Sequence, residues 1–257
     1  MTSRRKVLMG IACCPCVAVG FSTSALAKRL TEVGGCTIER KDSQLLRGRA
    51  VEIFGKRPGR FQPSEMEHST GNAEQNIKLD QALQDLASEF NVWPGFGFYD
   101  DYDGENALAL DYPLVQSTSH TVLFGKRLYR SMLRLDPSGA AVMWTAAHEF
   151  GHVWVYQEGL RDRLLTGQPT VKRLELHADF LAGYYLGLKK KRNPQVTLWE
   201  AGADIWNSGD SNFTSHQHHG TPAERLAAAE SGFRLSYLEN RSSHYAFAAA
   251  TNYVATR

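Results

Sequence analysis

Cysteine is scarce in this sequence. Only four are present, and three of them, Cys13, Cys14 and Cys16, lie near the start of the chain. Cys36 is the only one beyond that segment, which excludes an internal disulfide there and also a cluster of cysteine zinc ligands. A metal bound by the rest of the chain must therefore be held by histidine, aspartate or glutamate.

Long hydrophobic runs are also missing. The longest, residues 7–21, contains glycine and proline and falls short of the roughly 20 residues that a bilayer span needs. It follows a basic start at Arg4-Arg5 and precedes an Ala-Leu-Ala motif at 25–27, which is the layout of a secretory signal peptide. We therefore expect residues 1–27 to be a cleaved export signal. The protein would then be periplasmic or secreted from a bacterial cell, without stable membrane insertion.

The two arginines after Ser3 resemble a twin-arginine export signal, whose machinery passes folded proteins. A signal for the general secretory route also begins with basic residues, so that route stays open as the alternative. Charge of one sign is not in excess, because the chain has 29 Lys and Arg against 27 Asp and Glu. A short basic run at 189–192 is typical of a helix C-terminus, where the helix dipole favours cations. No nucleic-acid partner is therefore expected.

The rest of the chain predicts one domain preceded by an arm. Residues 28–71 are polar and rich in glycine and arginine, which indicates a loosely ordered N-terminal arm. Residues 72–257 predict an α+β domain that is mostly helical, with a small antiparallel or mixed sheet. Strands are expected within 91–111 and at 120–125. Helices are expected from 72, at 126–135, through 146–159, at 170–188, from 197, from 221 and from about 235.

Some helix boundaries have their own sequence signals. Asn72 and Asp136 are expected to cap the helices that follow them, and "TPAE" at 221–224 is typical of a helix start. Gly232 stands where a C-cap glycine would end that helix. Gly151, inside a helix, costs about 1 kcal/mol of helix stability, and we expect another element to pack closely there.

The stretch "AAHEFGHVWVYQEG", residues 146–159, contains the H-E-x-x-H pattern at His148, Glu149 and His152. Helix residues four apart share a face, so both histidines can bind one metal ion while Glu149 lies beside it. Zinc lowers the pKa of a bound water from about 16 to roughly 7, and a carboxylate at this position can accept the proton. The pattern predicts a catalytic site for one Zn²⁺, with Glu149 as general base.

Two histidines are too few for such a site, which takes three protein ligands. The extended motif that adds a third histidine is excluded, because Val155 and Glu158 stand where it requires glycine and histidine. "RLELHADFLAGYYLG" at 173–187 offers Glu175 as the third ligand. His177 is the alternative there, but it points about 200° round the helix from Glu175.

Asp179 lies four residues after Glu175 and shares its helical face. We expect it to accept a hydrogen bond from the outer ring nitrogen of a ligating histidine, which fixes that ring's orientation. A solvent-facing acid is the alternative. Trp144, Trp154 and Tyr156 are expected to be aromatics of the core and groove walls, not catalytic groups.

These motifs together resemble the gluzincin type of zinc metallopeptidase. "AAHEFGHVW" with "LELHADFLAG" is similar to the motif pair of HtpX-like and CAAX-protease-like peptidases and of neutral zinc metallopeptidases. "ENALALD" at 105–111 resembles their substrate-holding edge strand, and "HHGTPAERLAA" at 218–228 resembles their H-x-x-P-x-E-R segment. The matches cover about 105–233. HtpX-like and CAAX enzymes carry transmembrane helices, for which this chain beyond its signal has no candidate.

The resemblance implies a zincin-like domain whose edge strand flanks the active-site helix. It also implies an endopeptidase that acts on a peptide or protein substrate. Asn106 would bind the substrate backbone, and His219 would stabilise the charged intermediate, although His218 stands next to it as an alternative. Arg225 would steady this loop, or lie on the surface.

Two other functions stay open. One is an exported binding or structural protein that keeps the zinc-site scaffold without catalysis. The other is a hydrolase acting on amide bonds of cell-wall peptides. Glu149 discriminates against the first, because a purely structural zinc has no use for a general base beside an open position.

Overall fold

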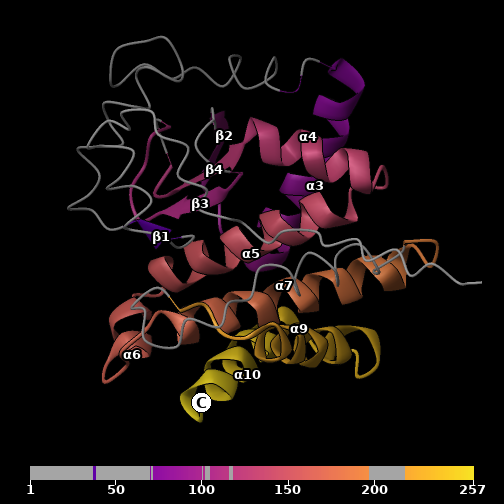
Figure 1. The fold of residues 1–257 in the computed structure, drawn as a ribbon. Helices are drawn as coiled ribbons and strands as arrows, with labels where there is room; N and C mark the ends of the chain where they lie inside the picture. The colour runs from indigo at the N-terminus through magenta and orange to yellow at the C-terminus, as the bar shows by residue number, and fades with distance from the viewer. Residues whose placement is uncertain are drawn as a thin grey trace, which may run out of the picture.

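The computed structural model describes residues 37–38, 70, 72–99, 101, 105–115, 118–196 and 218–257. In it a small sheet lies against stacked helices, with α5 next to the sheet, α7 beyond α5, and α9 and α10 outermost (Figure 1). The strands are β1 (Thr37–Ile38), β2 (Gly95–Tyr99), β3 (Ala107–Leu110) and β4 (Thr121–Gly125). The helices are α3 (Ala73–Phe90), α4 (Lys126–Leu135), α5 (Ala140–Gln157), α6 (Arg161–Leu165), α7 (Lys172–Arg192), α9 (Pro222–Tyr237) and α10 (Ser243–Ala255).

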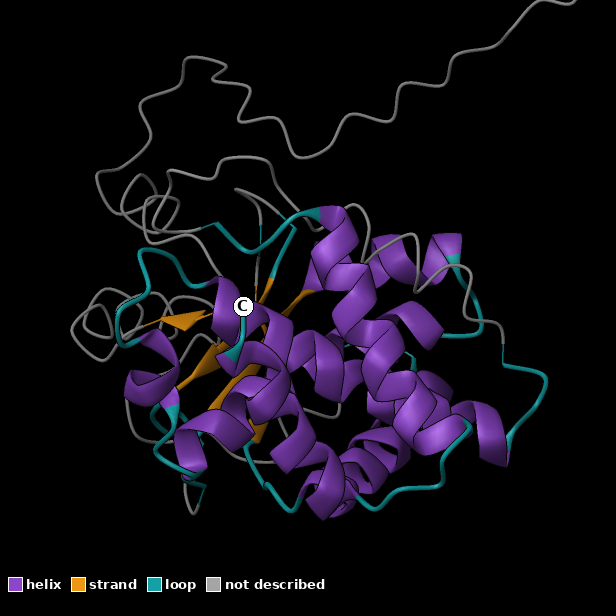
Figure 2. Ribbon diagram, turned by 90° about the horizontal axis from the view of Figure 1, so that it is seen from below, coloured by secondary structure: helices purple, strands orange, loops and turns teal. Residues whose placement is uncertain are grey.

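This architecture confirms a mostly helical α+β chain with a mixed sheet. The helices lie in front of the strands when the molecule is seen from below (Figure 2). The expected export signal at 1–27, nearly all of the N-terminal arm at 28–71 and the helix expected from 197 lie outside the described residues. Within the described part of the chain, no helix is both long and apolar enough to span a membrane.

The sheet has the strand order β1-β3-β4-β2, in which β3 and β4 are antiparallel and the other two pairs are parallel. β1 pairs with the end of β3, with Thr37 opposite Ala109 and Ile38 opposite Leu110. Strand β3 packs against α5, as expected. Because β1 pairs with it, β3 is not an edge strand in the described structure, and the expectation that it is one is wrong. A two-residue strand has no hydrophobic period, so the sequence gives no sign of it.

Helix α5 is buried on nearly all sides, because β3, β4, α3 and α7 pack around it. Its sequence is apolar all round, as expected of a helix in the interior. The N-cap is Gly139, not Asp136, and Gly139 adopts a left-handed conformation with φ of 78°. Asp136 still serves this end of the helix, since its Oδ2 accepts a hydrogen bond of 3.0 Å from the backbone N–H of Ala141.

Close backbone contact joins α7 to its neighbours. A Cβ atom on Gly151 would lie 3.1 Å from Cα of Ala178, which confirms the close approach expected at this glycine. A Cβ atom on Gly232 would lie 1.8 Å from the backbone oxygen of Phe180. Gly232 is therefore an interior contact, and its expected role as C-cap is wrong, because α9 continues to Tyr237.

The other predicted helix starts largely hold. Asn72 caps α3 by accepting from the N–H of Gln75, and Thr221 and Glu224 form a capping box at α9. The last helix begins later than expected, at Ser243, because α9 extends past 235.

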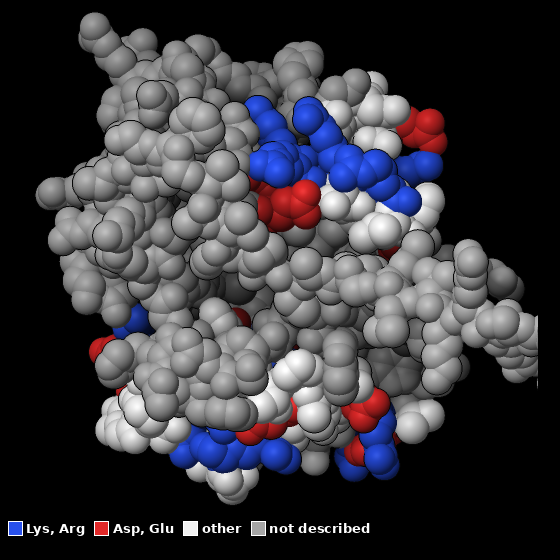
Figure 3. Space-filling view, viewed as in Figure 1, with Lys and Arg blue, Asp and Glu red and all other residues white. Residues whose placement is uncertain are grey.

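Figure 3 shows basic side chains gathered over α4, whose sequence is KRLYRSMLRL, with acidic residues beside them.

Candidate metal centre

Helices α5 and α7 bring His148, His152 and Glu175 into one buried group. The Nε2 atoms of the two histidines are 3.1 Å apart. The Glu175 carboxylate lies 3.4 Å from Nε2 of His148 through Oε2, and 3.6 Å from Nε2 of His152 through Oε1. Of the two residues considered for the third ligand, Glu175 and His177, it is Glu175 that lies with the histidines.

The geometry of this group fits a metal ion. Four ligands at about 2.1 Å from a tetrahedral ion are about 3.4 Å from one another, close to the three separations here. Both carboxylate oxygens of Glu175 are buried and have no hydrogen-bond partner among the described residues. A cation between these three side chains would supply the partner that both oxygens lack.

The ionisation of the group also suits metal binding. Burial lowers the pKa of His152 to about 3, so its ring is neutral and keeps a lone pair for a metal. Burial by itself would raise the pKa of Glu175, but the neighbouring His152, His148 and His219 outweigh it and lower that pKa. The lowered pKa of Glu175 favours the ionised carboxylate, which is the form that binds a metal.

Asp179 lies directly behind the first histidine. Its Oδ1 is 3.0 Å from Nδ1 of His148, as expected for a carboxylate that orients a ligating ring. Asp179 is 0% exposed, so the alternative of a solvent-facing acid is wrong. Burial would raise the pKa of Asp179, but Arg225 and His148 lower it.

Arg225 is the site residue whose place the sequence reasoning missed. It is 4% exposed, and its Nε and Nη2 atoms donate to Oδ2 and Oδ1 of Asp179 at 2.7 and 2.8 Å. The expected alternatives were a loop contact or a surface position. The sequence did contain a sign of this contact. Glu175 and Asp179 share one helical face, and two buried acidic residues on one face require a cation nearby.

Glu149 and His219 complete the surroundings of the group. Glu149 is buried beside His148 on α5. His219 precedes α9 and lies close enough to Glu175 to lower the pKa of its carboxyl group. His218, next to it in the chain, is buried.

Asn106 and His177 are not members of the group. Asn106 is exposed at the start of β3, and its Oδ1 accepts from the N–H of Ala107 at 3.0 Å. His177 faces α10, with Nε2 3.3 Å from Oγ1 of Thr251 and its ring stacked on Trp154. The alternative that His177 is the third ligand is therefore wrong.

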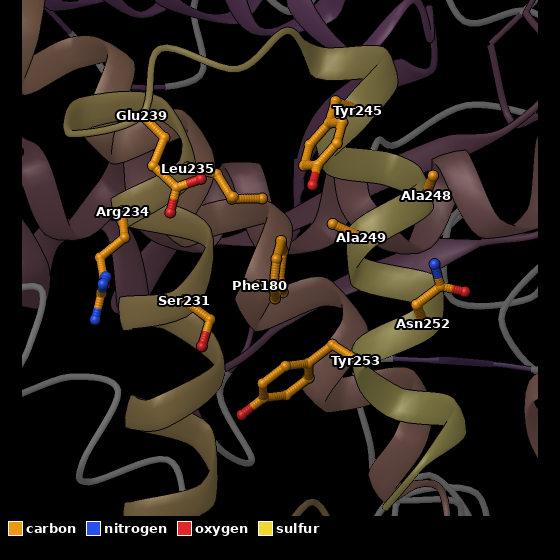
Figure 4. A pocket seen from close by; sticks show the side chains of 10 residues that line it. All are labelled: Phe180, Ser231, Arg234, Leu235, Glu239, Tyr245, Ala248, Ala249, Asn252 and Tyr253. Carbon is orange, nitrogen blue, oxygen red and sulfur yellow. The ribbon is translucent and has the colours of Figure 1, made fainter.

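A surface groove between α9 and α10 is a separate feature (Figure 4). It has a volume of about 590 Å³, and Phe180, Tyr245 and Tyr253 are among the residues that line it. None of the metal-group residues is among them. The groove is therefore separate from the candidate metal centre between α5 and α7.

Comparison of the chain with models of protein families, with curated proteins and with solved structures gives no match. The interpretation of the site rests on its residues and their geometry.

Proposed function

We propose that this chain is a zinc-dependent endopeptidase that hydrolyses peptide bonds of a peptide or protein substrate. The observation that carries the proposal is the buried group of His148, His152 and Glu175, with Glu149 beside it on α5. Two imidazoles and one carboxylate form a ligand set typical of catalytic zinc, with the fourth position left for water. Such a zincin-like site also agrees with the resemblance of the motifs to gluzincins.

Zinc, when bound, supplies the chemistry of polarising a water molecule and the substrate carbonyl. Glu149 accepts the proton of that water as it attacks and then donates the proton to the leaving amine. Its buried position keeps this proton transfer away from bulk water. Both proton transfers need the Glu149 carboxylate, which is not one of the proposed metal ligands. Loss of Glu149 is therefore expected to remove turnover and leave the metal ligands in place.

Asp179 and Arg225 act through His148. The Asp179 carboxylate accepts a hydrogen bond from Nδ1–H, which would leave the lone pair of Nε2 available to bind the metal. Arg225 balances the buried charge of Asp179 and fixes its orientation through two hydrogen bonds.

His219 and Asn106 would contact the substrate. His219 stabilises the negative charge that develops on the carbonyl oxygen, consistent with its electrostatic interaction with Glu175. Asn106, exposed at the start of β3, would hold the substrate backbone. Export of the protein through residues 1–27 is part of this proposal and is tested by locating the cleaved chain in the periplasm or medium.

A matched set of variants tests the function. The wild-type protein is expected to bind one zinc ion and cleave an unfolded protein substrate. Glu149→Gln keeps zinc and loses activity, Glu175→Ala loses both, and Glu158→Gln, at the exposed end of the same helix, keeps both. Full activity of Glu149→Gln would exclude the mechanism, and full zinc content of Glu175→Ala would exclude the ligand assignment.

The same experiment separates the alternatives. A non-catalytic zinc protein would bind the metal without cleaving any substrate. A cell-wall peptide amidase would cleave peptidoglycan fragments and leave unfolded protein intact, and its Glu149→Gln variant would lose that activity instead.

A further inference from the structure

Helix α4 carries four basic residues and no acidic one. In its sequence, KRLYRSMLRL, Arg127, Arg130 and Arg134 are exposed and Lys126 is half-buried. Because each helical residue turns the chain by about 100°, the three arginines lie within roughly 60° of one another round the helix. They form one basic face on the outside of the molecule, which is visible over α4 in Figure 3.

The opposite side of α4 is packed against the rest of the fold. Tyr129 and Met132 are buried there. The start of the helix is fixed as well, because the buried carboxylate of Asp101 accepts hydrogen bonds from the backbone N–H groups of Arg127 and Leu128, at 2.7 and 3.0 Å. The basic face is therefore held in a fixed position at the surface.

Basic residues of α7 show what a structural cation does in this fold. Lys189 and Arg192 both pair with the Asp85 carboxylate, at 2.7 and 2.9 Å. Within the described part of the chain, by contrast, Arg130 and Arg134 have no ion-pair partner. These two arginines are four residues apart, so their like charges repel each other across one helical turn. An anionic partner outside the chain would offset this repulsion.

An apolar side chain lies at the end of the basic face. Leu135, the last residue of α4, is 80% exposed, more than any other large apolar residue of the described chain. It lies about 100° round the helix from Arg134, at the margin of the basic face. A soluble polyanion offers nothing to this side chain, whereas a bilayer takes up apolar side chains directly beneath its charged headgroups. The combination of cations and an apolar side chain therefore favours a lipid surface.

We propose that the basic face of α4, together with Leu135, binds this protein reversibly to the surface of a bilayer that contains anionic phospholipid. The guanidinium groups donate charge-assisted hydrogen bonds to the lipid phosphates, for which their planar shape is suited. Each Lys or Arg close to an anionic membrane surface raises the affinity by about fivefold, so a few cations give a weak and reversible contact.

This inference does not depend on the proposed peptidase function. Helix α4 packs on α5 and β4, whereas α7, which carries Glu175, lies on the other side of α5 (Figure 1). Membrane binding and zinc binding are therefore expected to be separable.

Cosedimentation of the full chain with lipid vesicles tests the proposal. The protein is expected to bind vesicles of equal parts phosphatidylglycerol and phosphatidylcholine at least about 25-fold more tightly than vesicles of phosphatidylcholine alone, from fivefold for each of two arginines. This preference is expected at about 0.1 M salt and is expected to be lost at about 1 M, where the screening length falls from about 10 to about 3 Å.

Two double variants remove the same charge from different faces. Arg130→Gln with Arg134→Gln is expected to lower the affinity for the anionic vesicles by about 25-fold and to keep the melting temperature, since both positions are exposed. The matched control, Arg163→Gln with Arg234→Gln, changes exposed positions of α6 and α9. It is expected to keep the wild-type affinity within about twofold, because charges distant from the bilayer are screened.

Leu135→Ala distinguishes a bilayer from a soluble polyanion. It is expected to lower the affinity for the anionic vesicles by at least about threefold, because it removes apolar surface that the bilayer buries. Its affinity for inorganic polyphosphate is expected to equal that of wild type. Zinc content and turnover are expected to be unchanged in all of these variants.

Each contrary result has a defined meaning. Equal affinity of the wild type for both kinds of vesicle overturns the proposal. An equal loss in the two double variants also overturns it, because net charge and not the α4 face would then govern binding. Wild-type affinity of Leu135→Ala for the vesicles, together with equally tight binding of polyphosphate, would show a soluble polyanion site instead. Failure of the peptidase assay overturns only the proposed function.

Discussion

Arg225 holds the carboxylate of Asp179 through two hydrogen bonds, from Nε at 2.7 Å and from Nη2 at 2.8 Å. Asp179 in turn lies 3.0 Å from Nδ1 of His148. A buried chain of three side chains therefore connects α9, through α7, to His148 of α5, which belongs to the candidate metal centre. The outer helix α9 supports the metal group although it contributes no ligand to it.

Arg225→Leu is expected to lower both stability and zinc affinity. It leaves Asp179 buried without its cation, which costs about 3–5 kcal/mol of unfolding free energy. It also loosens the orientation of His148, for which a loss of 10-fold to 100-fold in zinc affinity is expected. Urea denaturation and a competition titration with a zinc chelator measure the two effects. Arg234→Leu, at an exposed position of the same helix, is the control, and equal effects in both variants would contradict this role for Arg225.

Removal of the metal is expected to shrink the effect of Glu175→Gln on stability. In the metal-free protein this variant loses only the interactions with the neighbouring histidines that lower the pKa of the Glu175 carboxyl group. With zinc present it is expected to lose in addition the stabilisation by the bound ion, which is about 2.7 kcal/mol at 100 times its Kd. Thermal unfolding with and without a chelator tests this. A change of equal size in both states would contradict a metal at Glu175.

Asp136→Asn is expected to destabilise the start of α5 in a pH-dependent way. Burial raises the pKa of Asp136, but hydrogen bonds from Ser138 and Ala141 outweigh it, so the folded-state pKa is below the usual value. A lowered pKa adds stability above the unfolded-state pKa of about 3.9, and this stability is lost as the pH falls through the folded-state value. The loss at neutral pH is expected to be about 1 kcal/mol, as for other helix-capping groups.

Urea denaturation of wild type and Asp136→Asn at neutral pH and in acid measures this effect. The difference in unfolding free energy between the two proteins is expected to shrink as the pH falls below about 4. A difference that does not change with pH would show that the charge of Asp136 contributes nothing.

Gly232→Ala is expected to separate α9 from α7. The added methyl group would lie 1.8 Å from the backbone oxygen of Phe180, a contact that only backbone movement relieves. Overpacking of this kind costs about 1–3 kcal/mol or more, although alanine normally favours a helix. Zinc affinity is expected to fall as well, since α7 carries Glu175 and Asp179. Ala227→Leu, at an exposed position of α9, is the control for both measurements.

The helix faces and several helix starts of this protein follow from its sequence alone. The four-residue spacing of His148 and His152 places both rings on one helical face, and the same spacing pairs Glu175 with Asp179. The helix starts at Asn72 and Thr221 follow from hydrogen bonds between residues three apart. Such features depend on backbone geometry within one element, so the sequence predicts them without the rest of the fold.

Only the tertiary structure decided which elements meet. Three contacts join segments that are far apart in the chain. Arg225 pairs with Asp179, β1 pairs with β3, and Gly232 packs against Phe180. Spacing within one helix says where a side chain points on that helix. What the side chain then meets depends on how α5, α7 and α9 bury their surfaces against one another, because the free energy of that packing is shared by all three helices.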